Sequence, residues 1–293
     1  MLWFALALSS ALLSAAAAVM QKQTLYRLSA LEFSFLVSII ILVLSSFVPL
    51  TADVTSLPAS TMMIVIGKSI IGGIAFLLVM TALERNQIST ALPLLGLTPA
   101  AAALLSLLAA GESLQPWEWA GIGMMTAGTY IVEKRPAQAF WAPFREAFAS
   151  RSRLSIVGAL VLFACSSVLD KTLVSGYRTP PLVVLFYQHI VYCGLFGVFL
   201  LARRASFPAL ARKGIGQLPL LAAVALVSLA YRFTQLEATK LAPVALVLAV
   251  KRTSILYASF YGGRIFSEER LTLKLLGGAL IVGGGFVILR NVG

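Results

Sequence analysis

Apolar runs separated by short polar gaps fill this sequence from its first residues to its last. A helix needs about 20 mainly apolar residues to cross about 30 Å of hydrocarbon, and the runs match that length. Proline or paired glycine marks several gaps, as at Leu57-Pro58, Gln115-Pro116 and Gly262-Gly263. The pattern predicts an all-α membrane protein of ten transmembrane helices, over residues 2–20, 30–49, 60–82, 88–110, 117–133, 154–175, 181–201, 216–238, 242–262 and 271–290.

A longer segment in the middle of the chain divides the predicted helices into two groups of five. We therefore predict a first five-helix repeat over 1–133, a linker over 134–153 and a second five-helix repeat over 154–293. Aromatic residues recur in the linker at helical spacing beside arginines, which is typical of an amphipathic helix lying in the membrane interface. These aromatic residues are Phe140, Trp141, Phe144 and Phe148.

The two groups of helices share sequence patterns in the same order. A Glu-x8-Gly-x6-Gly motif begins at Glu112 in the first group and at Glu268 in the second. Two shorter matches pair Val19–Lys22 with Val168–Lys171 and Thr81–Glu84 with Thr234–Glu237. Because five is odd, a duplicated unit of five helices is inverted relative to the first, and secondary transporters place their solute site between such inverted repeats. The sequence therefore predicts two inverted five-helix repeats around a central cavity.

Small residues inside the predicted helices are interpreted as packing residues. Glycines on the last helix of each repeat predict close approach to neighbouring helices. They are Gly121, Gly123, Gly128, Gly277, Gly278, Gly284 and Gly285. Cys165 and Cys193 lie inside predicted helices without metal-ligand spacing, so we expect neither a metal site nor a cofactor.

Composition and charge also indicate a lipid environment. The chain is 59% apolar and 12% charged, with a mean hydropathy of +0.93, whereas soluble domains average about 25% charged residues. The net charge of +12 does not indicate nucleic-acid binding, because the basic residues form no single patch and most lie in short gaps. They crowd the gaps that follow the odd-numbered helices, so the positive-inside rule predicts those gaps in the cytoplasm and both termini outside. No presequence precedes the first apolar run, and we expect a multi-pass protein of a prokaryotic plasma or inner membrane.

Four basic residues lie inside the predicted helices, while all 11 acidic residues fall at helix ends or in gaps. A charge at the bilayer centre costs about 2.5–3.5 kcal/mol and usually has a partner. Lys251 and Arg252 lie at the middle of the ninth helix, and we expect them to face a cavity. Lys68 and Arg232 are near enough to helix ends for snorkelling to remain an alternative. Without a carboxylate at matching depth, the expected counter-charge is an anionic substrate.

Further polar residues are predicted to border the same cavity. His189 alone would more often be structural, but beside cations it is a candidate anion donor or proton-linked switch. Asp170 and Lys171 are interpreted as a capping pair at a helix end. The complete predicted substrate-binding set is Lys251, Arg252, Arg232, Tyr231, His189, Gln188 and Lys68.

The sequence carries none of the motifs of a hydrolase, metalloprotease or nucleotide-driven pump, so we expect neither an enzyme nor catalytic residues. The leading hypothesis is a secondary-active, alternating-access carrier of a small organic anion, phosphorylated or carboxylated. An exporter of amino acids or amphiphilic compounds, coupled to protons, is the alternative. A lipid-handling protein that transports no solute is a third class. The expected partners are a small-molecule substrate and the lipid bilayer, and the sequence does not determine the oligomeric state, for which a monomer is plausible.

Two five-helix halves, with Glu-x8-Gly recurring at the last helix of each, resemble the drug/metabolite transporter superfamily, EamA type. The resemblance implies ten helices around a central cavity that works by alternating access, with both termini in the cytoplasm. The charge distribution predicts the opposite orientation of the termini.

Lys251-Arg252, followed by Thr253-Ser254, is similar to one branch of that superfamily, the plastid phosphate translocators and nucleotide-sugar transporters. The resemblance implies that Lys251 binds an anion as a point charge and Arg252 as a bidentate fork. Phosphate translocators carry a further lysine on their fourth helix, where this chain has Gly96-Leu97-Thr98-Pro99. An anion, and no particular sugar phosphate, is therefore the expected substrate.

Overall fold

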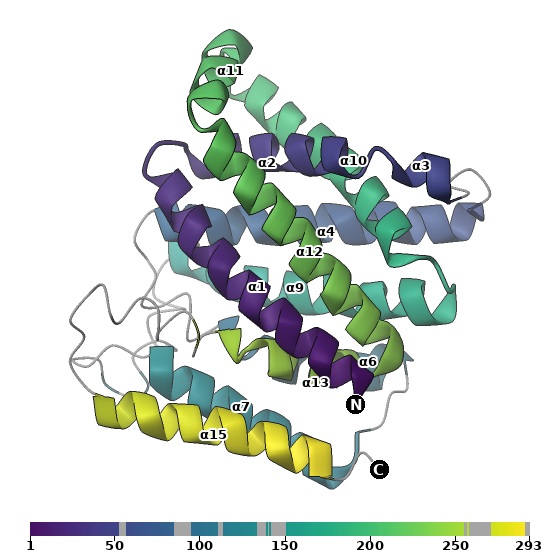
Figure 1. Ribbon diagram of the computed structural model, residues 1–293, viewed down its shortest axis with the longest axis vertical. Coiled ribbons are helices and arrows are strands. Elements are labelled where there is room, and N and C mark those ends of the chain that lie inside the picture. Colours follow the sequence, from purple (N-terminus) through teal and green to yellow (C-terminus); the bar gives the residue numbers. More distant parts are fainter. Residues whose placement is uncertain are drawn as a thin grey trace.

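The structure is a computed structural model that describes residues 1–52, 57–84, 95–110, 114–133, 139, 141, 151–254, 257 and 271–290. The regular secondary structure of these residues is helical throughout (Figure 1). The helices are α1 (Leu2–Leu25), α2 (Ala30–Leu44), α3 (Val48–Thr51), α4 (Ala59–Glu84), α6 (Thr98–Ala110), α7 (Pro116–Glu133), α9 (Arg151–Lys171), the π-helical turn η1 (Thr172–Gly176), α10 (Pro181–Ala202), α11 (Phe207–Gly216), α12 (Leu218–Leu241), α13 (Val244–Lys251) and α15 (Leu271–Arg290).

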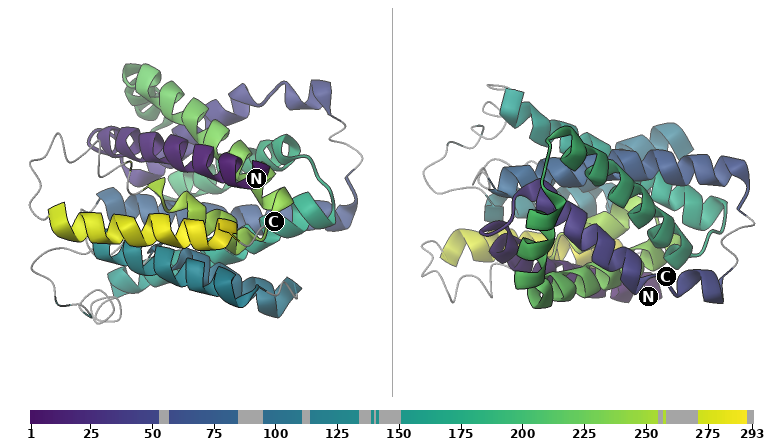
Figure 2. Two further views of the ribbon diagram at one scale, coloured as in Figure 1. Left: turned by 60° about the horizontal axis from the view of Figure 1, so that its bottom comes forward. Right: turned by 90° about the horizontal axis from the view of Figure 1, so that it is seen from above.

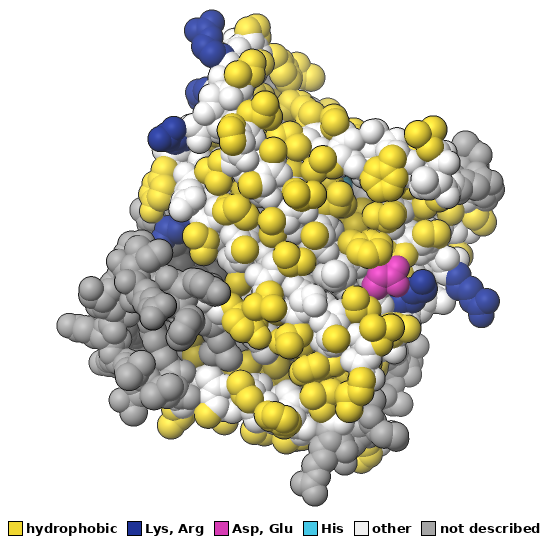
Figure 3. Space-filling view, in the orientation of Figure 1, with side chains coloured by type: hydrophobic (Ala, Val, Ile, Leu, Met, Phe, Trp, Pro, Cys, Tyr) yellow, Lys and Arg dark blue, Asp and Glu magenta, His cyan; other side chains and the backbone are white. Residues whose placement is uncertain are grey.

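The lengths and surfaces of these helices are those of a multi-pass membrane protein. Among the described residues, 6 helices are long and apolar enough to cross a membrane, and two shorter apolar helices cover Thr98–Ala109 and Leu276–Leu289. Hydrophobic side chains cover most of the described face in Figure 3, while basic side chains gather at its edges. The predicted all-α membrane class is therefore confirmed.

Each predicted transmembrane segment contains a described helix, but three segments differ in detail. The second segment is interrupted after α2, where the Ser45 hydroxyl donates to the carbonyl oxygen of Ile41, 2.8 Å away, before the short helix α3 begins. The gap after α10 contains the additional helix α11, whose Leu210 and Gly214 are buried. Most of the linker helix predicted within 134–153 lies outside the described residues.

The third difference concerns the ninth segment, predicted as one helix over 242–262. Helix α13 ends at Lys251, and a turn follows at Arg252 and Thr253. The Arg252 amide bonds the carbonyls of both Leu248 and Ala249, which tightens the last turn of the helix. The prediction of an uninterrupted helix through the Lys-Arg pair is therefore wrong.

The helices pack in pairs that join the first part of the chain to the second. The most extensive contacts link α7 with α15, α1 with α12 and α4 with α9, and further contacts link α2 with α10 and α6 with α13 (Figures 1 and 2). Every pair joins a helix that ends before residue 134 to one that begins after residue 150.

Glycines hold α7 and α15 together, as predicted. A Cβ atom on Gly128 would lie 2.5 Å from the Gly277 carbonyl oxygen, and one on Gly284 would lie 2.7 Å from the Gly121 carbonyl oxygen. The helix backbones therefore touch at both points, and the two helices run antiparallel. Gly123 differs, because among the described residues no atom of another helix comes within 4 Å of its Cβ position.

One end of the bundle is basic. There the Glu84 carboxylate, at the end of α4, accepts a hydrogen bond of 2.9 Å from the Ala30 amide at the start of α2. Lys213 of α11 reaches the same end, with its ammonium 2.7 Å from the Glu32 carboxylate. Exposed basic residues of this end are Lys22, Arg27, Arg203, Arg204, Arg212 and Lys213. The N-terminus lies at the opposite end, since Trp3 packs in one cluster with Ala238 and Ala242 at the end of α12.

Candidate functional site

A cavity of about 320 Å³ lies between the helix pairs and is lined by residues of α1, α2, α4, α6, α9, α10, α12 and α13, and by Leu95, Arg252 and Ser254. Arg232, Lys251 and Arg252 are the basic residues on its wall. Among the lining residues that the structure describes there is no Asp or Glu. The cavity reaches Gln21 and Leu83, which lie near the C-terminal ends of α1 and α4, so it extends to the basic end of the bundle.

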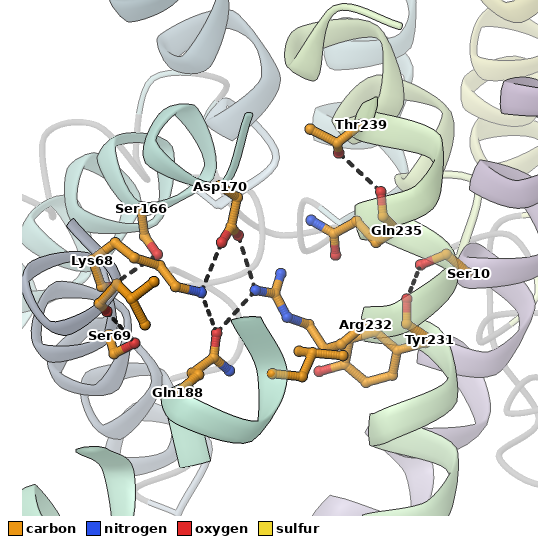
Figure 4. Close-up of polar contacts among 12 residues, drawn as sticks. Ser10, Lys68, Ser69, Ser166, Asp170, Gln188, Tyr231, Arg232, Gln235 and Thr239 are labelled. Carbon is orange, nitrogen blue, oxygen red and sulfur yellow. Dashed lines mark hydrogen bonds and ion pairs between the residues drawn. The ribbon is translucent and has the colours of Figure 1, made fainter. Parts of the chain in front are cut away.

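A buried polar network closes the inner end of this cavity. The Lys68 ammonium donates to Asp170 Oδ1 at 2.7 Å and to Gln188 Oε1 at 2.6 Å. The Arg232 guanidinium donates to Asp170 Oδ2 at 2.9 Å and to Gln188 Oε1 at 3.3 Å. Figure 4 shows both cations converging on the carboxylate and the amide from different helices. The side chains of Lys68 and Asp170 are 0% and 3% exposed, so this ion pair is buried. Four helices, α4, α9, α10 and α12, are thereby tied together.

This network corrects three sequence-based interpretations. Asp170 is not part of a capping pair at a helix end, because η1 continues α9 as far as Gly176 and leaves Asp170 well inside the helix. A carboxylate therefore does lie at the depth of the cations. Lys68 neither lines the cavity nor snorkels, since it is fully buried behind the wall. Arg232 does not snorkel either, because its guanidinium points inward to Asp170.

Lys251 and Arg252 both line the cavity, at the C-terminal end of α13. The Lys251 ammonium donates to Gln235 Oε1 at 2.6 Å and lies 4.5 Å from the centre of the Tyr231 ring. The Arg252 guanidinium donates to the Thr98 hydroxyl at 2.9 Å and to the carbonyl oxygen of Leu95.

The remaining predicted residues also reach the wall. Gln188 and His189 line it from α10, and Tyr231 lines it from α12. The carbonyl oxygen of Leu185 only accepts, so Nδ1 of His189 carries a proton and donates to it at 2.8 Å. The His189 ring also packs edge-on against Tyr192, with ring centres 5.5 Å apart. Thus the structure brings every predicted site residue except Lys68 to one cavity.

Sequence reasoning missed several residues of this site. Gln235 lies one helical turn after Tyr231, a spacing that places both on one face of α12 and would have identified it. Thr98 had no such signal, since its partner Arg252 is 154 residues away in sequence. Asp170 was interpreted as a cap, because its partner Lys68 is 102 residues away. Within the described part of the chain, no cluster of His, Cys, Asp or Glu could hold a metal ion.

Comparisons with known proteins bear on both the fold and the family. The family model described as "EamA-like transporter family" matches residues 1–133. One solved structure, described as "Crystal structure of protein", aligns over 98% of this chain and 96% of its own with a TM-score of 0.73. Its sequence identity of 18% makes the likeness one of fold alone. No curated protein matches the sequence.

Proposed function

The N-terminal half of this chain belongs to the EamA-like transporter family of the drug/metabolite transporter superfamily, and we propose that the protein is a secondary-active, alternating-access carrier of a small organic anion. Membership of this family establishes only that the chain is a transporter of small molecules and not an enzyme. That the substrate is an anion is our proposal. It rests on a cavity whose described lining carries the charges of Arg232, Lys251 and Arg252 and no carboxylate.

The positions of these cations support binding of an anion rather than a purely structural role. A charge taken out of water is costly unless it is paired, and Asp170 already pairs with Lys68. The Lys251 ammonium is held by a neutral amide and an aromatic ring, neither of which cancels its charge. An anion in the cavity would pair with the charge of Lys251. We propose Lys251 and Arg252 as primary ligands, with Arg232, Tyr231, His189 and Gln188 completing the site.

We also propose that the fold consists of two inverted five-helix repeats, residues 1–133 and 154–293. The contacts support this, because the most extensive ones have counterparts when the two halves are exchanged. The contact of α1 with α12 corresponds to that of α9 with α4, and the contact of α6 with α9 corresponds to that of α13 with α1. The glycine contacts behave alike: Gly121 with Gly284 corresponds to Gly277 with Gly128.

The shape of the cavity supports a state that is open at the basic end. Beyond the Lys68–Asp170 network, a cluster of fully buried side chains fills the opposite end, among them Val65, Leu173 and Leu236. Under the positive-inside rule the basic end faces the cytoplasm, so we propose an inward-open state in a prokaryotic inner membrane with the N-terminus outside.

Thermal unfolding in a panel of small anions, cations and neutral metabolites tests the proposed substrate class. A ligand at 100 times its dissociation constant, bound only to the folded state, adds about 2.7 kcal/mol of stability. We expect phosphate or carboxylate compounds to stabilise the protein, and Lys251→Met with Arg252→Met to abolish that stabilisation. Lys213→Met is the matched control, because Lys213 is 51% exposed and lies on the surface helix α11.

Two other outcomes would contradict the proposal. Stabilisation by neutral or cationic compounds alone, unchanged in the double variant, would favour the proton-coupled exporter of amino acids or amphiphilic compounds. Loss of anion stabilisation in the Lys213 control as well would indicate nonspecific charge screening. Uptake of the stabilising anion into proteoliposomes then separates a carrier from a protein that only binds.

A further inference from the structure

The cavity has two contrasting surfaces, and each comes mainly from a different part of the chain. Apart from Ser38 and Gly72, helices α2 and α4 contribute hydrophobic side chains to the cavity, here named the apolar wall. It consists of Val37, Ile41, Phe76, Val79, Met80 and Leu83. All six belong to one hydrophobic cluster, so they pack against a common core.

Helices α10, α12 and α13, with the residue that follows α13, contribute polar and basic side chains, here named the basic wall. It consists of Gln188, Tyr231, Arg232, Gln235, Lys251 and Arg252. These side chains are joined by the bonds of Arg232 to Gln188 and of Lys251 to Gln235, and by the stacking of Lys251 over Tyr231. Every charged residue in the described lining therefore belongs to the second part of the chain.

The difference in polarity between the two walls is clearest on α2 and α10, whose lining residues have the same spacing. From α2 the cavity receives Val37, Ser38 and Ile41; from α10 it receives Gln188, His189 and Tyr192. Both sets have i, i+1, i+4 spacing, but only the second is rich in hydrogen-bonding groups. The apolar wall is thus a distinct feature of the cavity.

We propose that the transported substrate is an amphipathic anion, whose charged group binds the basic wall while an apolar body lies against the apolar wall. This proposal rests on the anion site proposed above and specifies the rest of the molecule. A wholly polar anion would leave its hydroxyl groups unpaired against Val79 and Met80, which costs affinity. Because the apolar wall runs to Leu83, near the end of α4, the body points toward the basic end of the bundle.

A series of straight-chain alkyl phosphates from methyl to hexyl tests this inference. Dissociation constants are measured with the purified protein in lipid nanodiscs, at fixed ionic strength and below micelle-forming concentrations. Each added methylene that is buried against an apolar wall raises affinity about fourfold. We expect that rise in the wild type, and no binding of any member in Lys251→Met with Arg252→Met.

A pair of isosteric variants separates the apolar wall from the lipid. Val79→Thr places a hydroxyl on the wall and is expected to weaken hexyl phosphate while leaving methyl phosphate unchanged. Val161→Thr is the control, because Val161 is 45% exposed on α9 and does not line the cavity. Its affinities should match those of the wild type across the series.

The outcomes distinguish this inference from the anion site itself. Alkyl phosphates that bind with the same affinity at every chain length would overturn the amphipathic substrate and leave the anion site standing. A rise with chain length that Val161→Thr reduces as much as Val79→Thr would assign the effect to the bilayer and also overturn it. Failure of every alkyl phosphate, with alkylammonium ions binding instead, would overturn the proposed function.

Discussion

The Lys68–Asp170–Arg232 network predicts an unequal response to removal of its charges. Two cations share one carboxylate, with Lys68 2.7 Å and Arg232 2.9 Å from its two oxygens. Asp170→Asn removes the only negative charge of this network and leaves Lys68 buried beside a second cation. Removing one partner of a buried ion pair costs about 3–5 kcal/mol, and we expect the free energy of unfolding to fall by that amount.

Lys68→Met should cost much less. The Asp170–Arg232 bond persists in that variant, and the remaining pair is electrically neutral. Asp170 and Gln188 each lose one hydrogen bond but keep Arg232 as donor. Loss of a hydrogen bond to a charged group costs about 1.5–3 kcal/mol, part of which the buried methionine offsets, so we expect about 1–2 kcal/mol.

The double variant Lys68→Met with Asp170→Asn provides the decisive comparison. It leaves Arg232 as the only charge, with a side chain that is 19% exposed at the cavity and open to water. We therefore expect the double variant to be about 1–3 kcal/mol more stable than Asp170→Asn alone. Equilibrium unfolding in mixed detergent micelles measures all three differences. If both single variants cost the same and their effects add, charge balance does not stabilise this network and the reasoning is refuted.

Three further predictions concern other parts of the molecule. Gly128→Ala should destabilise the protein by about 1–3 kcal/mol, since its Cβ would meet the Gly277 carbonyl, whereas Gly123→Ala should not; thermal unfolding compares the two. Tyr231→Leu should weaken anion binding by disordering Lys251, a contribution of about 0.5–2 kcal/mol, while Tyr231→Phe keeps the ring and should bind normally in a titration. With Cys165 and Cys193 replaced by Ser, an impermeant maleimide should label Tyr177→Cys in intact cells and Ser206→Cys only after lysis; the reverse pattern would place the termini in the cytoplasm.

The sequence predicted the helices well because lipid imposes a simple requirement. Uninterrupted apolar runs have no stable alternative to a helix in hydrocarbon, so α1, α4, α10 and α12 follow the predicted segments closely. The break after Lys251 lacked the usual signal, since neither Gly nor Pro stands beside it. Hydrogen bonds of Arg252 to Thr98 and Leu95, from a distant segment, stabilise that turn.

Only those residues of the candidate site were predictable whose burial in the membrane is itself energetically costly. Lys251, Arg252 and Arg232 were identifiable because a charge within an apolar run is expensive wherever it points. Their partners were not, because pairing depends on how distant helices meet. Lys68 shows the limit of this reasoning. The free-energy cost of its buried charge suggested a cavity residue, but the Asp170 carboxylate offsets that cost, and Lys68 is buried away from the cavity.

The proposed duplication explains why the repeat was visible in packing residues and not in the cavity. Gly121 and Gly277 each lie against the backbone of the neighbouring helix, where a larger residue would not fit. Because the two positions correspond when the halves are exchanged, the same packing requirement keeps both as glycine. Thr98 and Lys251 occupy matching places in their halves, each following a lining leucine by three residues, yet one carries a hydroxyl and the other a charge. Both side chains line the cavity in which we propose that the solute binds, so helix packing alone does not hold the two positions to the same residue. Positions that match in spacing and differ in polarity are therefore the ones at which we expect substitutions to change substrate preference with little effect on stability.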